Sequence, residues 1–209
     1  MEERIVTPPD DYASPALREI VSRLGSSGRK VVLDLGRPSS ENVQFFSSRN
    51  CKLFISDFFD CLSEEGAVAR QGRSAFKGAC SKLLSFPQGT TFDYILAWDL
   101  LNYLSMSEVE VLTEHLLGYC TVGTRMMALV SIYQRIPDEP FRFFAVDEER
   151  VRYESATLAQ RESPRHKESD LLHGMVCFEV ETSLLLRHGM REYGFIVTED
   201  IRRRAVAKA

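Results

Sequence analysis

The stretch Lys30–Gly36 (KVVLDLG) constrains the fold more than any other feature of the chain, because an acidic residue, Asp57, follows 21 positions after its glycine. Three apolar residues followed by Asp34 and Gly36 predict a strand buried on both faces that ends in a tight turn. A second apolar run, Leu53–Ile55, ends just before Asp57. In βαβ folds, a carboxylate about 20 residues beyond such a glycine turn binds the two hydroxyls of a ribose. The pattern therefore predicts a site for a nucleoside-containing ligand.

Two further apolar runs continue this pattern. Phe92–Asp99 (FDYILAWD) ends in an acidic residue, and Met126–Tyr133 (MMALVSIY) follows a helix that Ser105 and Glu108 are predicted to cap. Strands that are apolar on both faces and alternate with helices predict an α/β fold with a parallel sheet covered on both sides. Right-handed crossovers place the carboxyl ends of such strands at one edge, where ligands bind. The acidic strand ends are therefore expected to lie together.

The remaining segments are expected to complete one domain. Residues 1–13 are predicted to be a flexible arm, residues 14–200 a single domain, and residues 201–209 a basic tail. Within the domain, residues 134–170 combine irregular apolar spacing with many charges, which favours a cap over the core. Its arginines could hold an anionic substrate, although the neighbouring acidic residues could simply neutralise them.

Outside the four main apolar runs, the sequence pattern predicts two closing strands, a helix and a short strand. Val176–Leu186 and Gly194–Thr198 predict two closing strands joined near Arg187–Gly189. Between residues 58 and 90, we expect a helix over Ser63–Gln71 and a short strand near Ser81–Ser85.

Composition narrows the function classes. A net charge of −4 and a pI near 5.7 argue against nucleic-acid binding. No apolar run approaches the ~20 residues of a membrane helix, and the N-terminus lacks the apolar core of a signal peptide. The five cysteines are scattered without a CxxC pair, and the four histidines show no ligand spacing. We therefore expect a cytoplasmic protein with reduced thiols and no metal site.

In their order and spacing, the motifs resemble those of class I S-adenosylmethionine-dependent methyltransferases. VVLDLGRPSS stands where that family carries its D-x-G-x-G-x-G loop, LFISD resembles its second strand, and FDYILAWDLLNYL resembles its fourth. GTRMMALVSIY and FEVETSLLLRHGMREYGFIV resemble the fifth strand and the closing antiparallel strands. The resemblance spans residues 15–200. It implies a doubly wound, mostly parallel Rossmann-like sheet with helices on both faces and an antiparallel closing strand at the C-terminus.

The resemblance also implies S-adenosylmethionine as the cofactor and a role for each strand-end residue. Asp34 would orient the loop and receive the amino group of the methionine moiety. Gly36 would supply the turn where the ligand approaches the backbone closely. Asp57 would accept both ribose hydroxyls, and Asp99 would lie near the methionine portion or the substrate. Pro38 takes the place of the loop's second glycine, and it has no N–H to donate to a carboxylate.

Several alternatives stay open at this point. Asp57 could equally be a helix N-cap, and Trp98 is interpreted as core packing rather than as a contact of the sulfonium. The predicted function is methyl transfer to an unidentified small molecule or protein, with no general base assigned. The alternative is a catalytically inactive methyltransferase-like domain, which would act as a protein-interaction scaffold or as a nucleoside-ligand sensor.

Overall fold

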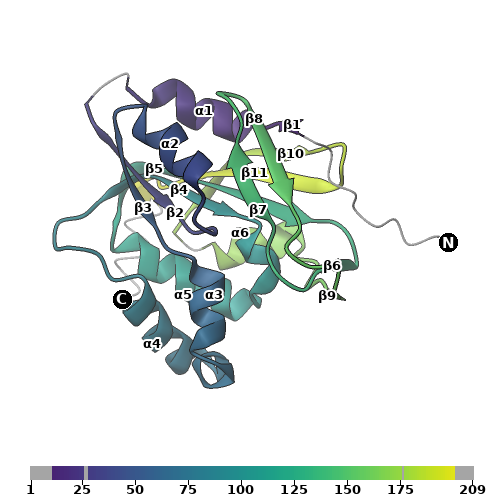
Figure 1. Cartoon of the computed structure of the whole chain (residues 1–209). Helices are drawn as coiled ribbons and strands as arrows, with labels where there is room; N and C mark the ends of the chain where they lie inside the picture. Colours follow the sequence, from purple (N-terminus) through teal and green to yellow (C-terminus); the bar gives the residue numbers. More distant parts are fainter. Residues whose placement is uncertain (1–10, 26–27, 176, 201–209) are drawn as a thin grey trace.

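A six-stranded sheet forms the centre of the computed structural model, which describes residues 11–25, 28–175 and 177–200 (Figure 1). The strand order is β10-β11-β5-β4-β2-β3, with β2 Lys30–Asp34, β3 Cys51–Ile55, β4 Phe92–Trp98, β5 Cys120–Ser131, β10 Glu179–Leu185 and β11 Met190–Ile196. Strands β2 to β5 are parallel, and β11 runs antiparallel to both of its neighbours. The predicted parallel sheet and its antiparallel closing strand are confirmed.

Helices cover both faces of this sheet (Figure 1). One face carries α1 Pro15–Arg23 and α2 Ser40–Ser47. The other carries α3 Phe58–Glu64, α4 Arg73–Leu83, α5 Met106–Leu117 and α6 Glu168–Gly174. Two short 3₁₀ helices, η1 Ala67–Arg70 and η2 Leu100–Tyr103, complete the helical elements of the described residues. Alternate residues of β4 point to opposite cores, as expected for a strand buried on both faces.

Residues 134–170 fold over the core through short strands. β6 Arg135–Pro137 pairs with β9 Gln160–Glu162, and β7 Arg142–Ala145 pairs with β8 Arg150–Glu154. β1, Tyr12–Ala13, adds to the outer edge of β8. We call the sheet β1-β8-β7 the cover. Tyr12, Phe143 and Tyr153 of the cover share one core with α1, α2 and β4.

Two expectations about the middle of the chain were wrong. The strand expected near Ser81–Ser85 is absent, because Phe76, Ala79 and Cys80 have helical spacing and bury one face of α4. The helix expected over Ser63–Gln71 is divided into α3 and η1.

The expected boundary of the N-terminal arm also shifts. Tyr12 and Ala13 form β1 and therefore belong to the domain rather than to the arm. Residues 1–10 and the basic tail 201–209 lie outside the described residues. Within the described ranges, no helix is both long enough and apolar enough to cross a membrane, and no disulfide bond joins the cysteines there.

Candidate ligand site at the carboxyl edge of the sheet

Three acidic residues meet at the carboxyl edge of neighbouring parallel strands. Asp34 ends β2, Asp57 follows β3, and Asp99 follows β4. The strands are held in register there, since the Ser56 N–H donates to the Asp34 carbonyl oxygen at 2.8 Å. The predicted meeting of these strand ends is therefore confirmed, and the environment of each carboxyl decides what it can bind.

Asp34 is a buried carboxylate whose partners come from the chain itself. It is 1% exposed and accepts hydrogen bonds from the Gly36 N–H at 2.9 Å, from Trp98 Nε1 at 2.7 Å and from Asn42 Nδ2 at 3.4 Å. Burial raises its pKa to about 6, although the three donors favour the charged form. Three of its roughly four lone-pair directions are in use, which leaves little capacity for a further donor.

Trp98 lies directly against the glycine turn. It is the last residue of β4, has a φ of 47° and is 2% exposed. A Cβ added to Gly36 would lie 2.7 Å from Cδ1 of the Trp98 indole. The indole also stacks on Phe143 of β7, with ring centroids 5.0 Å apart and an interplanar angle of 5°. The space left open by the missing Gly36 side chain is thus filled by Trp98, whose interpretation as a core residue is confirmed.

Asp57 caps the helix that follows it. Its Oδ1 accepts a hydrogen bond from the Asp60 N–H at 3.2 Å, so α3 begins here by the N-cap rule. Partial burial raises the pKa of Asp57, the Asp60 carboxylate raises it further, and the nearby Arg37 guanidinium lowers it. The N-cap alternative is confirmed, while binding of a ribose by the same carboxylate stays a prediction.

Arg37 connects three parts of the edge. Its guanidinium lies 2.9 Å from the Asp60 carboxylate of α3 and 2.7 Å from the Glu139 carboxylate beyond β6. The side chain is 14% exposed, and its charge lowers the pKa of both Asp57 and Asp99. The positive charge of this loop arginine therefore offsets the negative charges of the carboxylates at the carboxyl edge.

Asp99 is buried beneath the segment that leads into β7. It is 2% exposed, and its Oδ2 accepts a hydrogen bond from the Phe141 N–H at 3.1 Å. Burial raises its pKa to about 7. Like Asp34, Asp99 is occupied by a contact within the chain.

The residues after Asp99 fasten β5 and the segment before β7 to the edge. Asn102 donates to the carbonyl oxygens of Asp99 and Leu129, both at 2.9 Å, and accepts from the Ser131 N–H at 2.8 Å. The Tyr103 hydroxyl donates to the Glu139 carbonyl oxygen at 2.8 Å. Both side chains therefore have structural partners.

Pro38 is exposed in the loop between β2 and α2. Next to it, the Ser39 hydroxyl accepts from the Asn42 N–H at 3.0 Å and caps α2. The residues after Gly36, which depart from the glycine-rich pattern, therefore lead into helix α2, whose N-cap is Ser39. Asn42 was missed by the sequence reasoning, and its place near the start of an amphipathic helix gave no functional signal.

A cluster of polar side chains without partners lies under the cover. The hydroxyls of Tyr12 and Tyr153 and both ring nitrogens of His188 are buried, and they have no hydrogen-bond partner among the described residues. The His188 ring centroid lies 4.6 Å from that of Tyr12 and 5.5 Å from that of Tyr153. Sequence reasoning missed this cluster, because its members come from β1, β8 and the β10–β11 turn.

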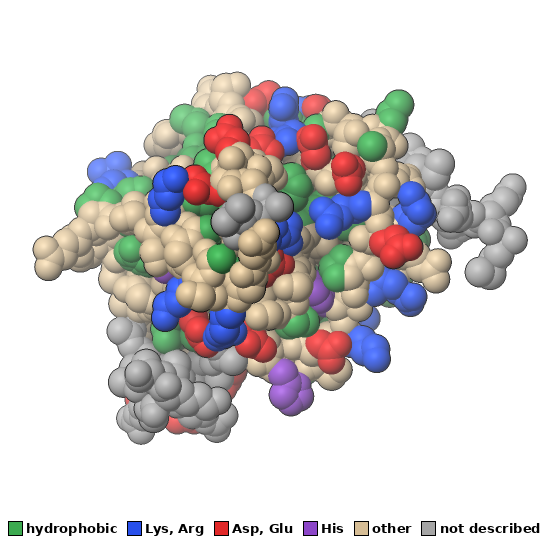
Figure 2. Space-filling view, turned by 90° about the horizontal axis from the view of Figure 1, so that it is seen from below, with side chains coloured by type: hydrophobic (Ala, Val, Ile, Leu, Met, Phe, Trp, Pro, Cys, Tyr) green, Lys and Arg blue, Asp and Glu red, His purple; other side chains and the backbone are tan. Residues whose placement is uncertain are grey.

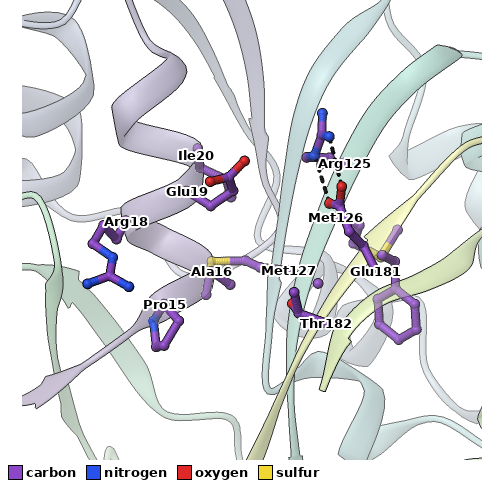
Figure 3. A pocket seen from close by; sticks show the side chains of 12 residues that line it. Pro15, Ala16, Arg18, Glu19, Ile20, Arg125, Met126, Met127, Glu181 and Thr182 are labelled. Carbon is purple, nitrogen blue, oxygen red and sulfur yellow. Dashed lines mark hydrogen bonds and ion pairs between the residues drawn. The ribbon is translucent and has the colours of Figure 1, made fainter. Parts of the chain in front are cut away.

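Other features of the surface lie away from this edge. A hollow of about 330 Å³ runs between α1, the first half of β5 and the β10–β11 pair, with the Arg125–Glu181 ion pair at its rim (Figure 3). Acidic and basic side chains are interspersed over the face seen in Figure 2. The described residues contain no group of three or more His, Cys, Asp or Glu side chains placed to hold a metal ion.

Comparison with known proteins gives a fold and no sequence family. No family model and no curated protein sequence matches the chain. The structure is similar to a solved S-adenosylmethionine-dependent methyltransferase from Clostridium acetobutylicum, with a TM-score of 0.50 and 12% identity over 86% of this chain and 88% of that one. A Pyrococcus horikoshii protein gives a TM-score of 0.50 and 12% identity over 88% of this chain and 89% of that one. At these identities the likeness is one of fold.

Proposed function

We propose that this chain, which has the fold of class I S-adenosylmethionine-dependent methyltransferases, binds S-adenosylmethionine at the carboxyl edge and transfers its methyl group to a small-molecule or protein acceptor. The observation that carries the proposal is the meeting of Asp34, its glycine turn and Asp57 at adjacent strand ends. A fold by itself does not determine chemistry, so the proposal depends on these side chains.

The two halves of the cofactor differ in how they fit the described conformation. The nucleoside half suits Asp57, because a partly buried carboxylate at the end of an edge strand can accept from both ribose hydroxyls. The methionine half does not fit beside Gly36, since Trp98 lies there and donates to Asp34. Binding of the complete cofactor therefore requires Trp98 to move.

The protein's part in such a reaction is alignment and exclusion of water. S-adenosylmethionine supplies an activated methyl group when bound, so the chain has mainly to orient the acceptor and keep the edge dry. Tyr103, Phe141 and Phe143 are buried over the edge and serve the second purpose. This assignment makes residues 134–170 the cap on the acceptor side, as the sequence predicts.

We assign proton removal from the acceptor to His188, because its turn lies at the carboxyl end of β5, where the Ile132 N–H donates to the Gly189 carbonyl oxygen at 3.2 Å. Burial lowers the pKa of His188, so the imidazole is neutral at pH 7 and can accept a proton. Burial raises the pKa of the neighbouring Tyr12, and the carboxyl groups of Glu192 and Asp99 raise it further. Because these groups make the surroundings acidic, an amine or a neutral hydroxyl suits this position better than an anion.

Two arginines of the cap, Arg135 and Arg150, do not favour an anionic acceptor either. Arg150 pairs with Asp147 at 2.6 Å and with Asp11 at 3.1 Å, and Arg135 is exposed beside Gln160. Their charges are directed to exposed partners rather than to the edge.

Calorimetric titration with S-adenosylhomocysteine tests the proposal. The wild-type chain should bind, and Asp57→Asn should weaken binding at least about tenfold, which is a loss of about 1.4 kcal/mol. Asparagine is as good an N-cap as aspartate, so this variant keeps the start of α3 while losing the charge. Asp138→Asn, which changes an exposed carboxylate, is the matched control. Saturating ligand with no heat and no change in melting temperature would refute the proposal.

A second candidate function is a cofactor-free domain that binds another protein. The hydrogen bond from Trp98 to Asp34 favours it, because the chain itself occupies the expected ligand contacts. Absence of binding by the wild-type chain, together with a defined complex with one partner, would support this candidate. Binding of S-adenosylhomocysteine without detectable methyl transfer would instead indicate a nucleoside-ligand sensor.

A further inference from the structure

We propose that Trp98 is a built-in occupant of the methionine subsite, so that the described structure is a closed state from which the indole must withdraw before the cofactor binds. The inference rests on the proposed function. Trp98 meets Asp34, to which the methyltransferase resemblance assigns the amino group of the methionine moiety, and Gly36, where the resemblance implies close approach of the ligand. Its Nε1 donates to Asp34 at 2.7 Å, and its ring carbon lies where a Gly36 side chain would be. The indole N–H of Trp98 therefore takes the place of a ligand donor to Asp34, and the indole ring takes the place of a ligand beside Gly36.

The closed state is held by contacts from two sides. Phe143 stacks on the indole from β7, and Asn42 of α2 donates to the Phe143 carbonyl oxygen at 3.0 Å. On the open side of the edge, Arg37 links the loop after β2 to Glu139 of the cap. Withdrawal of Trp98 therefore requires the cover to shift away from β4 together with Phe143.

The closed state also contains destabilising features that an open state would remove. Trp98 has a φ of 47°, in the left-handed region that branched and bulky residues avoid. Arg37 Nε, at the carboxyl edge, and the polar atoms of Tyr12, Tyr153 and His188, under the cover, are buried without hydrogen-bond partners among the described residues. A buried polar atom without a partner is destabilising, and exposure to water would satisfy it. Such features reduce the free energy needed for opening.

The tryptophan provides its own assay, because it is the single tryptophan of the sequence. Its emission reports one position that is 2% exposed in the closed state. Titration of the wild-type chain with S-adenosylhomocysteine should shift this emission to longer wavelength and increase its quenching by acrylamide. The fluorescence change and the calorimetric heat should give the same dissociation constant.

Two substitutions test competition between the indole and the ligand. If the open state is about a tenth of the population, removal of the indole in Trp98→Ala should tighten binding of S-adenosylhomocysteine about tenfold. Trp98→Phe keeps an aromatic ring but loses the donor to Asp34, and it provides the measurement if Trp98→Ala does not fold. Phe143→Leu removes the stacked ring while keeping Trp98, and it should also tighten binding.

The outcomes separate this inference from the proposed function. Wild-type binding with unchanged tryptophan emission would overturn the inference and leave cofactor binding intact. Failure of the wild-type chain and of all folded variants to bind would overturn both. Weak but measurable wild-type binding that tightens in Trp98→Phe or Trp98→Ala would support both.

Discussion

Asp99 is a carboxyl group that the fold holds out of water. Its hydrogen bond from the Phe141 N–H favours the ionised form, but burial outweighs it and raises the pKa to about 7. The ordinary value for this side chain is near 3.9. Between these two values the folded chain binds more protons at Asp99 than the unfolded chain, so this group makes stability fall as the pH rises from 4 through 7.

Asp99→Asn should remove this part of the pH dependence. Asparagine keeps an oxygen that can accept from the Phe141 N–H, and it carries no charge. We expect the variant to match the wild type at pH 4 and to exceed it at pH 8 by on the order of 4 kcal/mol, because a pKa difference of about three is lost and each pKa unit corresponds to about 1.36 kcal/mol. Urea unfolding at pH 4, 6 and 8 measures the difference. Asp138→Asn, at an exposed position, is the control, and a D99N effect that is equal at pH 4 and pH 8 would contradict the argument.

The placement of Asp34 and Asp99 at strand ends was predictable from sequence, and the partners of these side chains were not. An acidic residue directly after an apolar run marks a strand end, which identified Asp34 and Asp99. The groups that saturate these carboxyls lie far along the chain, since Trp98 is 64 positions from Asp34 and Phe141 is 42 positions from Asp99. Local periodicity carries no information about such pairings.

At the scale of elements, α2 joins the sheet edge to the cover through one side chain. Asn42 donates to the Phe143 carbonyl oxygen at 3.0 Å and accepts from the Ala145 N–H at 2.9 Å. The amide therefore takes the place of a neighbouring strand for β7. Its second contact, at 3.4 Å, reaches Asp34.

Asn42→Ala should loosen the cover, because it leaves the backbone groups of Phe143 and Ala145 without partners. We expect a loss of about 1–3 kcal/mol in the free energy of unfolding. Hydrogen exchange of the β7 amides should accelerate more than that of β4. Gln44→Ala, on the exposed face of the same helix, is the matched control. Unchanged exchange in β7 would show that Asn42 does not hold the cover.

The elements differ in how far the sequence predicts them. The parallel strands were recognised because each is an uninterrupted apolar run of at least three residues with a polar end. β1 contains two residues and forms through pairing with β8, so it has no periodicity of its own. The strand expected near Ser81–Ser85 was a wrong reading of the end of α4.

At the scale of the whole molecule, Glu192 ties the start of the domain to its last strand. It is 2% exposed, and its carboxylate accepts from the Ser14 hydroxyl at 2.5 Å and from the Ala16 N–H at 2.8 Å. These donors belong to the first turn of α1, where a negative charge also complements the helix dipole. The contact spans 178 positions of the sequence.

Glu192→Ala should destabilise the whole domain, because it leaves two buried donors unpaired. We expect a loss of about 1–3 kcal/mol, seen as one cooperative shift in urea unfolding. Glu192→Gln keeps an acceptor and should lose less. Glu179→Ala, at an exposed position of β10, is the control. An E192A chain as stable as the control would contradict this role.

The same long contact has a consequence for the chain as it is being synthesised. The parallel strands can pair once residue 131 has left the ribosome, whereas Ser14 must wait for Glu192. At about 5–20 residues per second, 178 residues correspond to a delay of roughly 10–35 s. Throughout that interval the start of α1 lacks its contact with the last strand, so the first helix of the domain to be synthesised is among the last to be fixed in place.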